Sequence, residues 1–442
     1  MKSSIMKTKR IRGLRYFVSI VSVLLVAAMS VYFASQLKPE IFSTLVQKSP
    51  TNVVLIMTDD QNVDSLPVMR KLMAFPEGSW VNFTNAFVNN SFCCPSRATV
   101  LTGQYSHVTG VIDNESGQKL NDTNTLPVWL DKAGYQTVLI GKYLNNYPWD
   151  KGEGYVPPGW TLFQADSRGG VDRYTKRALD FINNSKPPFF LYLAYRAPHY
   201  PARPLHRYAT ADVYLPPDPP NFNEVDISDK PEWLREIEPL SQLAIDSWKA
   251  ERVASQRALL GIDDGVQQII DALKAKGQLD NTLIIFMSDN GFSWGSHRYI
   301  RKQCAYEECS KIPLLIRYPG LRGNRDELRL VSNVDLAATI AEYAGVIPEL
   351  PENGKSLIPL ITNTTTNWDE EILLERIGAG PFAFYGIRVP GWKYVEYFKG
   401  DLELYDLNSD PYELQNLANQ PEYQSKQAEL AHQLQLLKQD PP

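Results

Sequence analysis

The chain has 442 residues, 43% of them hydrophobic and 21% charged, which is typical of a globular protein large enough for one α/β domain with a smaller appendage. Its formal net charge is −5, so it lacks the basic surface of nucleic-acid-binding proteins, and this argues against nucleic acid as a partner. Its four cysteines are too few for the disulfide framework of a small secreted domain.

The first fifty residues combine a basic start with a long apolar stretch. Lysines and arginines are frequent up to Arg15, and the run from Tyr16 to Leu37 carries no charged residue. This run is longer than the apolar part of a usual signal peptide and just long enough to span a bilayer as a helix. Small residues around Ala28 would also permit cleavage, so an anchor and a cleaved signal both stay open. Either one predicts an extracytoplasmic protein, attached to the membrane if the segment is uncleaved.

Four apolar runs are typical of buried parallel strands, and polar residues follow each of them. The runs cover residues 52–58, 137–140, 189–193 and 282–288. The residues that follow them are, in chain order, Asp59 and Asp60, Lys142, His199, and Asp289 with Asn290. In open α/β sheets ligands bind beyond the carboxyl ends of the strands, so we expect these polar residues to form one site.

The remaining elements complete an α/β fold with a large central, mostly parallel mixed sheet flanked by helices. Apolar residues at helical spacing predict a long helix over residues 243–276, and the proline-rich stretch 198–239 predicts a surface loop. Beyond residue 379 the pattern changes to short antiparallel strands at 382–389, 392–397 and 404–407, followed by a helix over 422–438. We therefore expect a signal or anchor segment with a linker at 1–50, a catalytic domain at 51–378 and a small C-terminal subdomain at 379–442.

The most distinctive motif lies at residues 93–103, where Cys-Cys-Pro-Ser-Arg is followed by Leu-Thr-Gly. It resembles the maturation signature of the type I sulfatases, Cys-x-Pro-Ser-Arg, and the resemblance extends over nearly the whole chain after Thr51. It implies that Cys93 is converted to formylglycine (3-oxoalanine) by a formylglycine-generating enzyme. It also implies that the chain is a sulfatase, a hydrolase of sulfuric esters.

Four of the residues at the strand ends carry hard oxygen donors, which favour Ca²⁺ or Mg²⁺ over softer metals. Taken alone, an Asp-Asp pair after a strand or an Asp-Asn-Gly sequence is more often a helix cap or a turn. In the sulfatases the matching pairs hold a divalent ion, usually calcium, together with the formylglycine. The resemblance therefore implies a metal site formed by Asp59, Asp60, Asp289 and Asn290 with the modified Cys93.

The resemblance also assigns five side chains to the reaction. Arg97 corresponds to the arginine that stabilises the hydrated aldehyde and the metal ligands. Lys142 corresponds to a sulfate-binding lysine, and His199 to a histidine that binds sulfate or assists protonation of the leaving group. Lys302 is assigned to sulfate binding or leaving-group protonation, and His297 is a weaker candidate for the acid.

These residue types match what the reaction demands. A sulfate ester needs a nucleophile, positive charge around its sulfonyl oxygens and an acid for its poor leaving group. Hydrated formylglycine is a geminal diol, so one hydroxyl attacks sulfur and the other expels sulfate as the aldehyde re-forms. The three carboxylates contribute a charge of −3, whereas a divalent ion with Arg97, Lys142 and Lys302 contributes +5. This surplus suits a dianionic transition state, and like-charge repulsion should lower the pKa of both lysines.

The substrate and two local details stay open. The doubled cysteine and the Gly-Lys-Tyr-Leu-Asn stretch at 141–145 are most similar to the N-acetylglucosamine-6-sulfatases, which implies a sulfated carbohydrate or aryl sulfate substrate. Alternatives are a phosphodiester or phosphonate monoester hydrolase of the same superfamily and an inactive binder of sulfated glycans. Because Arg301 lies beside Lys302, the alignment of this stretch with the family's catalytic lysine stays open by one residue. Cys304 and Cys309 can pair only if their segment is not helical, because positions five apart on a helix lie too far apart.

Overall fold

The computed structural model describes residues 51–75, 80–147, 152, 154–349, 352–378 and 380–439. The predicted signal or anchor segment and its linker lie outside these residues. In the described part of the chain, no helix has both the length and the apolar character needed to cross a bilayer.

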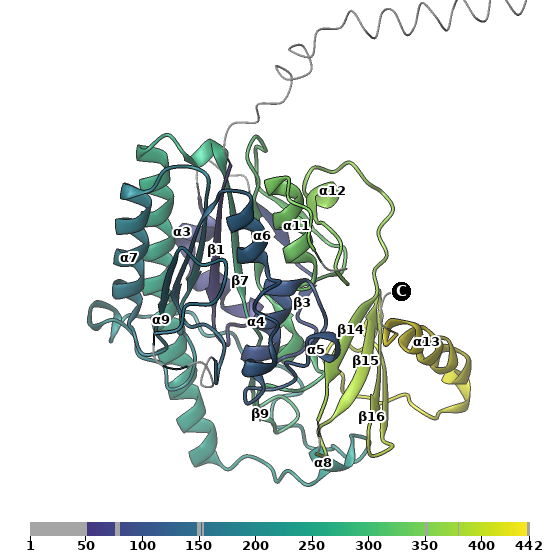
Figure 1. Ribbon diagram of the computed structural model, residues 1–442. Helices are drawn as coiled ribbons and strands as arrows, with labels where there is room; N and C mark the ends of the chain where they lie inside the picture. The colour runs from purple at the N-terminus through teal and green to yellow at the C-terminus, as the bar shows by residue number, and fades with distance from the viewer. Residues whose placement is uncertain are drawn as a thin grey trace, which may run out of the picture. The chain divides into compact units, whose positions relative to one another are not determined.

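An eight-stranded sheet forms the centre of the described unit (Figure 1). Its strands are β1 (Asn52–Thr58), β2 (Trp80–Phe83), β4 (Gln136–Gly141), β5 (Leu162–Ala165), β6 (Phe189–Ala194), β7 (Thr282–Ser288), β11 (Leu314–Arg317) and β12 (Arg325–Glu327). They lie in the order β12-β2-β11-β7-β1-β6-β4-β5. The four strands predicted from the sequence are confirmed as β1, β4, β6 and β7. They are neighbours, and all of them run parallel, whereas β11 is antiparallel to β7.

Helices cover both faces of this sheet because successive side chains of each strand point to opposite faces. Val53, Leu55 and Met57 of β1 face a core shared with α4 (Cys93–Thr102), α6 (Leu126–Lys132) and α11 (Asp335–Ala344). Val54 and Ile56 face α7 (Val171–Asn184) and α9 (Gln242–Ala275) on the other side (Figure 1). The long helix predicted over 243–276 is α9, and its start is capped by the Ser241 side chain.

Shorter elements connect these layers. The short helices are α3 (Arg70–Met73), α5 (Ser106–Thr109), α8 (Glu232–Arg235), α10 (Glu307–Ser310) and α12 (Ile358–Ile361). Five two-residue strands form two small sheets: β3 (Ala86–Phe87), β10 (Lys311–Ile312) and β13 (Val331–Ser332) in one, and β8 (Ser293–Trp294) with β9 (Ile300–Arg301) in the other. The proline-rich stretch 198–239 contains only α8 and a short 3₁₀ turn, as its composition predicts.

A four-stranded antiparallel sheet follows towards the C-terminus, as expected. It consists of β14 (Ile372–Arg376), β15 (Phe384–Val389), β16 (Trp392–Tyr397) and β17 (Leu402–Asp406), and α13 (Gln424–Leu437) packs on it through Leu430 and Leu434. The sequence pattern did not indicate β14. Because β14 precedes residue 379, the sheet begins before the predicted start of the subdomain, and the domain division itself stays a prediction.

Candidate active site

The polar residues after β1, β4, β6 and β7 meet at one edge of the central sheet. Asp59 and Asp60 follow β1 directly, and Asp289 and Asn290 follow β7, to which β1 is paired in register. The backbone N–H of Asp60 donates to Oδ1 of Asp289 at 3.2 Å. Asp60 has a φ of 64°, in the left-handed region that non-glycine residues seldom adopt, which is common for residues held at functional sites. All four side chains are buried.

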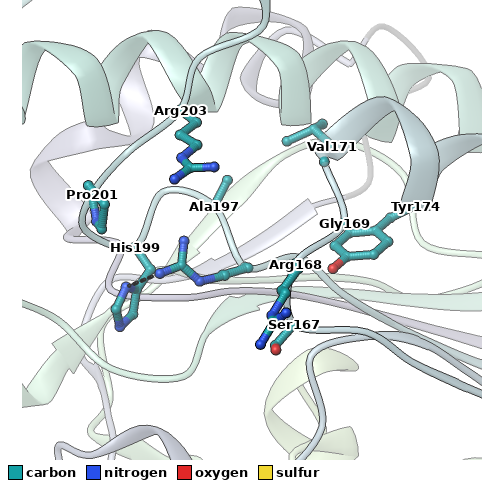
Figure 2. Close-up of a pocket in the computed structure, with 11 residues that line it drawn as sticks. Ser167, Arg168, Gly169, Val171, Tyr174, Ala197, His199, Pro201 and Arg203 are labelled. Carbon is teal, nitrogen blue, oxygen red and sulfur yellow. Dashed lines mark hydrogen bonds between the residues drawn. The ribbon is translucent and has the colours of Figure 1, made fainter.

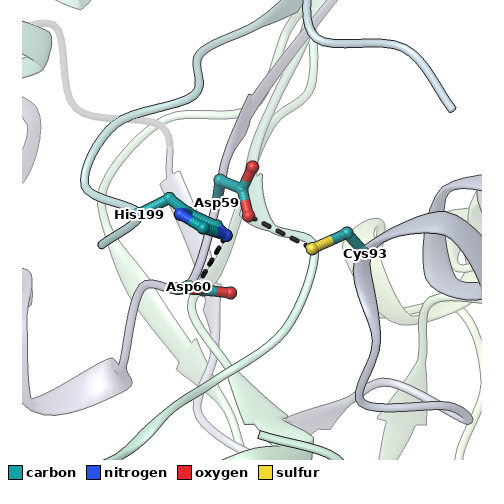
Figure 3. Close-up of side chains that lie close together, drawn as sticks. All are labelled: Asp59, Asp60, Cys93 and His199. Carbon is teal, nitrogen blue, oxygen red and sulfur yellow. Dashed lines mark hydrogen bonds and ion pairs between the residues drawn. The ribbon is translucent and has the colours of Figure 1, made fainter. Parts of the chain in front are cut away.

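Cys93 enters this cluster from the first position of α4. Its Sγ lies 3.4 Å from Oδ1 of Asp59, and the side chain is 1% exposed (Figure 3). Arg97, one helical turn later, is also fully buried and directs its guanidinium at Asp289, with Nε and Nη2 at 2.8 and 2.7 Å from Oδ2. Arg97 also donates to the carbonyl of Lys142 at 2.6 Å. One turn of helix therefore supplies both the candidate nucleophile position and the cation that orients Asp289.

Two lysines reach the same carboxylates from other strands and loops. Lys142, immediately after β4, places Nζ 2.5 Å from Oδ2 of Asp59. Lys302 places Nζ 2.5 Å from Oδ1 of Asp60 and 2.6 Å from Sγ of Cys93. The neighbouring Arg301 is exposed, so the structure brings Lys302, and not Arg301, to the cluster.

The protein groups around the two lysines raise the pKa of both. Burial is the largest influence on Lys142 and by itself would lower its pKa, but Asp59, Cys93 and Asp289 together raise the pKa above the usual value. Burial likewise opposes the charge of Lys302, and the Asp60 carboxylate raises its pKa well above the usual value. Each ammonium lies close to a carboxylate, which accounts for the raised values. The lowered lysine pKa values were expected for a site that holds a divalent ion, and they stay a prediction. Burial raises the pKa of the Cys93 thiol to about 12.

The two histidines named from the sequence lie in different surroundings. Nε2 of His199 is 3.6 Å from Oδ2 of Asp60, and its ring is partly exposed at the mouth of the cluster (Figure 3). Nη2 of Arg196 lies 3.3 Å from its Nδ1, a partner that the sequence pattern did not single out. His297 is buried elsewhere: its Nδ1 contacts Glu224 at 2.5 Å and its Nε2 contacts Asn221 at 3.2 Å. Because both ring nitrogens are engaged away from Cys93, the geometry favours a structural role for His297.

The donor set fits a hard divalent cation. Ligand atoms of Asp59, Asp60, Cys93 and His199 all lie within 4.8 Å of one another. Oδ1 of Asn290 is buried and has no hydrogen-bond partner among the described residues, while its Nδ2 donates to Oδ1 of Asp60 at 2.6 Å. A buried amide oxygen without a donor is costly unless something else binds it, and a cation among three carboxylates would do so.

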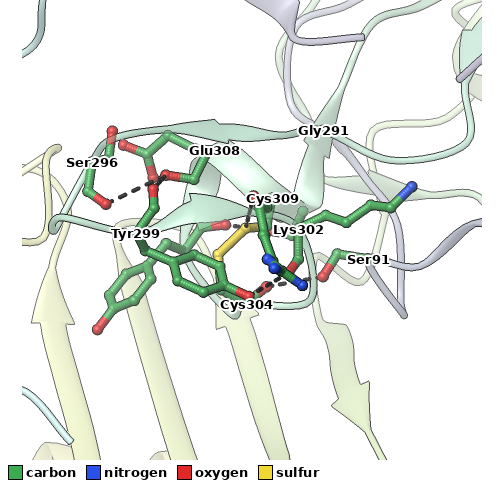
Figure 4. Close-up of a disulfide and its surroundings, with 12 residues drawn as sticks. Ser91, Gly291, Ser296, Tyr299, Lys302, Cys304, Glu308 and Cys309 are labelled. Carbon is green, nitrogen blue, oxygen red and sulfur yellow. Dashed lines mark hydrogen bonds between the residues drawn. A yellow bond between two sulfur atoms is a disulfide. The ribbon is translucent and has the colours of Figure 1, made fainter. Parts of the chain in front are cut away.

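A disulfide holds the segment that carries Lys302. Cys304 and Cys309 are paired, with Cα atoms 5.6 Å apart (Figure 4). The pairing is possible because α10 begins only at Glu307, so the intervening residues are not one helix. The Tyr299 hydroxyl donates to the Lys302 carbonyl at 2.8 Å, and the Ser91 hydroxyl donates to the Cys304 carbonyl at 3.0 Å. These contacts tie the Lys302 loop to the segment that leads into Cys93.

The comparison with protein families identifies the fold and the reaction class. The family described as Sulfatase matches residues 51–346, about two thirds of the chain. The chain belongs to the sulfatase family. It is accordingly a sulfuric ester hydrolase, and residues 295–440 also match the family described as the C-terminal part of N-sulphoglucosamine sulphohydrolase.

Individual sulfatases are similar over most of the chain. The human N-acetylglucosamine-6-sulfatase is 32% identical over 375 residues, covering 74% of this chain and 68% of the relative. The N-acetylglucosamine-6-O-sulfatase of Bacteroides thetaiotaomicron is 28% identical over 479 residues, covering 87% and 85%. A protein solved with its substrate D-glucosamine-2-N,6-O-disulfate has a TM-score of 0.71 and 25% identity, covering 88% of this chain and 97% of that one. A phosphonate monoester hydrolase of Agrobacterium radiobacter shares the fold, with a TM-score of 0.74 and 22% identity, covering 88% and 95%.

Proposed function

We propose that this sulfatase removes sulfate from a sulfated carbohydrate, with 6-O-sulfated N-acetylglucosamine as the candidate substrate, through a formylglycine at position 93. The observation that carries the proposal is the place of Cys93. Its Sγ, which marks where the formylglycine oxygens would lie, is between Nζ of Lys302 at 2.6 Å and Oδ1 of Asp59 at 3.4 Å. The substrate class is supported by the N-acetylglucosamine-6-sulfatases that the chain resembles.

Formylglycine at position 93 would supply a geminal diol, which offers one hydroxyl for attack on sulfur and a second to release sulfate. Asp59, Asp60, Asp289 and Asn290 would hold a divalent cation, Ca²⁺ or Mg²⁺, that lowers the pKa of the attacking hydroxyl and neutralises charge. Arg97 orients Asp289 through its two short contacts with Oδ2. Its charge opposes burial and the Asp59 carboxylate, which together raise the pKa of Asp289. The burial of Arg97 leaves it no access to bulk solvent, so its role is positioning.

The two lysines and His199 surround the place where the sulfate group would bind. In the described structure the charges of Arg97, Lys142 and Lys302 balance those of the three carboxylates. A bound divalent cation would leave a surplus of positive charge, and the ammonium groups would then face the sulfate oxygens. Nζ of Lys302 lies 2.6 Å from Sγ of Cys93, so the ammonium group is placed to donate a hydrogen bond or a proton to the leaving oxygen.

His199 occupies the opposite, outer side of this group. It is partly exposed, and Arg196 and the Tyr200 carbonyl fix its Nδ1 side, so its Nε2 faces the cluster. We assign it to binding the sulfate or to assisting the leaving group. The extracytoplasmic location is proposed from the N-terminal sequence and from the disulfide, because disulfides persist in oxidising compartments.

The decisive experiment combines mass spectrometry of the peptide that contains residue 93 with kinetics on N-acetylglucosamine 6-sulfate. We expect an aldehyde in active protein and loss of turnover in Cys93→Ala. Cys94→Ala is the matched control, since Cys94 occupies the variable position of the motif and its Sγ lies 3.6 Å from the Asn145 carbonyl, with Cys93 left in place. Full turnover with an unmodified thiol would contradict the proposal. Faster hydrolysis of a phenyl phosphonate monoester than of any sulfate ester would favour the phosphonate alternative.

A further inference from the structure

A cavity of about 500 Å³ lies beside the cluster of Asp59, Asp60 and Cys93, and its charged side chains are all basic (Figure 2). It lies between the segment that joins β5 to α7, which contributes Arg168, and the segment after β6, which contributes Arg196, His199 and Arg203. Among the described residues that line it, none is a carboxylate. In a chain with a net charge of −5, such a lining is not expected from composition.

None of the three arginines of this cavity forms an ion pair with a described carboxylate. The guanidinium groups of Arg168 and Arg203 make no hydrogen bond or ion pair with any described residue, and both residues are exposed. Among the described residues, Arg196 contacts the His199 ring and the Tyr200 carbonyl and forms no ion pair with a carboxylate. Elsewhere on the surface arginines are often paired, as Arg207 is with Asp172 and Asp264. Three unneutralised guanidinium groups around one cavity are a site for an anion, since guanidinium binds sulfate and carboxylate oxygens in a bidentate manner.

The start of helix α7, which borders the cavity, adds to the positive electrostatic potential of the arginines. Gly169, Gly170 and Val171 line the cavity, and α7 begins at Val171 without a side-chain cap. The unpaired N–H groups and the dipole at the start of a 14-residue helix attract negative charge. The helix start alone would not define a site, but here it faces the same cavity as the arginines.

The cavity is continuous with the approach to the reaction centre. Ser167, Arg196 and His199 line it and also line a second cavity of about 460 Å³, which includes Lys142 and one carboxylate, Asp166. Oδ1 of Asp166 accepts hydrogen bonds from the backbone N–H groups of Arg168 and Gly169. Nζ of Lys142 contacts Asp59, and Nε2 of His199 is 3.6 Å from Asp60. One sugar can therefore place a sulfate at Cys93 while another part of the same substrate lies among the arginines.

We propose that the cavity lined by Arg168, Arg196 and Arg203 binds a second anionic group of the substrate, so that the enzyme prefers saccharides with another sulfate or carboxylate near the sulfate it removes. This inference rests on the proposed function, because it assumes that the scissile sulfate binds at Cys93. The second anion has two chemical sources. One is a sulfo group on the same sugar, and the other is the carboxylate of a neighbouring uronate.

The test compares three substrates that share the 6-sulfate: N-acetylglucosamine 6-sulfate, glucosamine 2-N,6-O-disulfate, and a disaccharide of a uronate with N-acetylglucosamine 6-sulfate. We expect the native enzyme to favour one or both dianionic substrates in kcat/KM. Arg168→Gln and Arg203→Gln should each lower that preference about tenfold, since a charge-assisted hydrogen bond is lost. Turnover of the monosulfated sugar should stay within about twofold, because an exposed charge acts weakly at a distance. The substrate whose kcat/KM falls most in the arginine variants identifies the source of the second anion.

Arg322→Gln is the matched control. It removes the same charge from an exposed arginine that follows β11. Because β11 is antiparallel to β7, it ends at the sheet edge opposite the candidate active site. This variant should leave all three substrates unchanged.

A binding measurement distinguishes a failure of this proposal from a failure of the proposed function. Calorimetry of glucosamine 2-N,6-O-disulfate with Cys93→Ala protein measures affinity without turnover, and adding Arg168→Gln or Arg203→Gln should weaken it about tenfold. Equal affinity and equal substrate preference with and without these arginines would overturn the second-anion site. By contrast, protein that carries formylglycine yet hydrolyses no sulfate ester would refute the proposed function, whatever the arginine variants bind.

Discussion

Nζ of Lys302 lies 2.6 Å from Sγ of Cys93 and 2.5 Å from Oδ1 of Asp60, although more than 200 residues separate it from either in sequence. The contact joins a loop that follows β9 to the start of α4 and the end of β1. It makes Lys302 the cation nearest to the position of the candidate nucleophile, and it gives the first prediction.

Lys302→Met should lower kcat on N-acetylglucosamine 6-sulfate by about 100-fold or more, because one preorganised donor to the developing negative charge is removed. The side chain volume is nearly kept, so the fold should persist. Arg301→Met is the control, since Arg301 is adjacent and exposed, and it should leave kcat nearly unchanged. Steady-state kinetics on purified, aldehyde-containing protein would measure both. Similar losses in the two variants would argue that Lys302 acts only through folding.

Chelation should abolish turnover, and added Ca²⁺ should restore it, with Mg²⁺ as the comparison. The ion should also raise the melting temperature, since it binds the folded state and neutralises buried carboxylates. Asn290→Leu should weaken the apparent affinity for the ion by about tenfold or more, as one oxygen ligand is lost. Scanning calorimetry with and without Ca²⁺ would measure the effect. Turnover that is indifferent to chelators would exclude the metal site.

The disulfide predicts a coupled effect on stability and catalysis. Replacing both Cys304 and Cys309 by serine opens a short loop, so the free energy of unfolding should fall by only about 2 kcal/mol. The kcat should fall as well, because the same loop carries Lys302. Urea denaturation and kinetics on the double variant would measure the two effects. Unchanged kcat with reduced stability would show that the Tyr299 and Ser91 contacts suffice to hold the loop.

Glu352 predicts a stability that depends on pH. Burial alone raises the pKa of this carboxyl from 4.5 to about 7, and its Oε1 has no hydrogen-bond partner in the described part of the chain. The folded state therefore holds this proton more tightly than the unfolded chain between these two pH values. Stability falls as pH rises through this range, and the loss is complete above about pH 7.

Glu352→Gln should remove this dependence. It should raise the free energy of unfolding by about 2–3 kcal/mol at pH 8 relative to the native protein, and by much less at pH 5. Thermal denaturation at the two pH values would measure the difference. An equal gain at both pH values would show that the effect comes from packing and not from ionisation.

The sequence was sufficient for the elements that organise the site. Strands β1, β4, β6 and β7 are buried on both faces, so each is a continuous apolar run that can be recognised locally. Residues placed directly after such strands, including Asp59 and Asp289, must then meet at one edge. By contrast, β14 follows a polar stretch and gives no comparable signal. The Cys304–Cys309 pair depended on where α10 begins, which the sequence did not determine.

The electrostatic surroundings of the site were harder to predict from the sequence than the identity of its residues. The pKa values of the two lysines depend on which charges lie nearest, and only the folded chain shows that Asp59 and Asp60 do. Arg168 and Arg203 lie in loops with no motif, and an isolated loop arginine is normally solvated. Their relation to the reaction centre arises only when the segments after β5 and β6 come together.

The complete burial of Cys93 has a consequence for biosynthesis. A modifying enzyme must bind several residues around its target, and in the folded protein the Cys93 side chain, at the start of α4, is only 1% exposed. The proposed oxidation at this position would therefore have to occur while the nascent polypeptide is still unfolded. Protein that folded before modification would keep an unmodified, inactive thiol at residue 93. The yield of active enzyme would then depend on the relative rates of modification and folding.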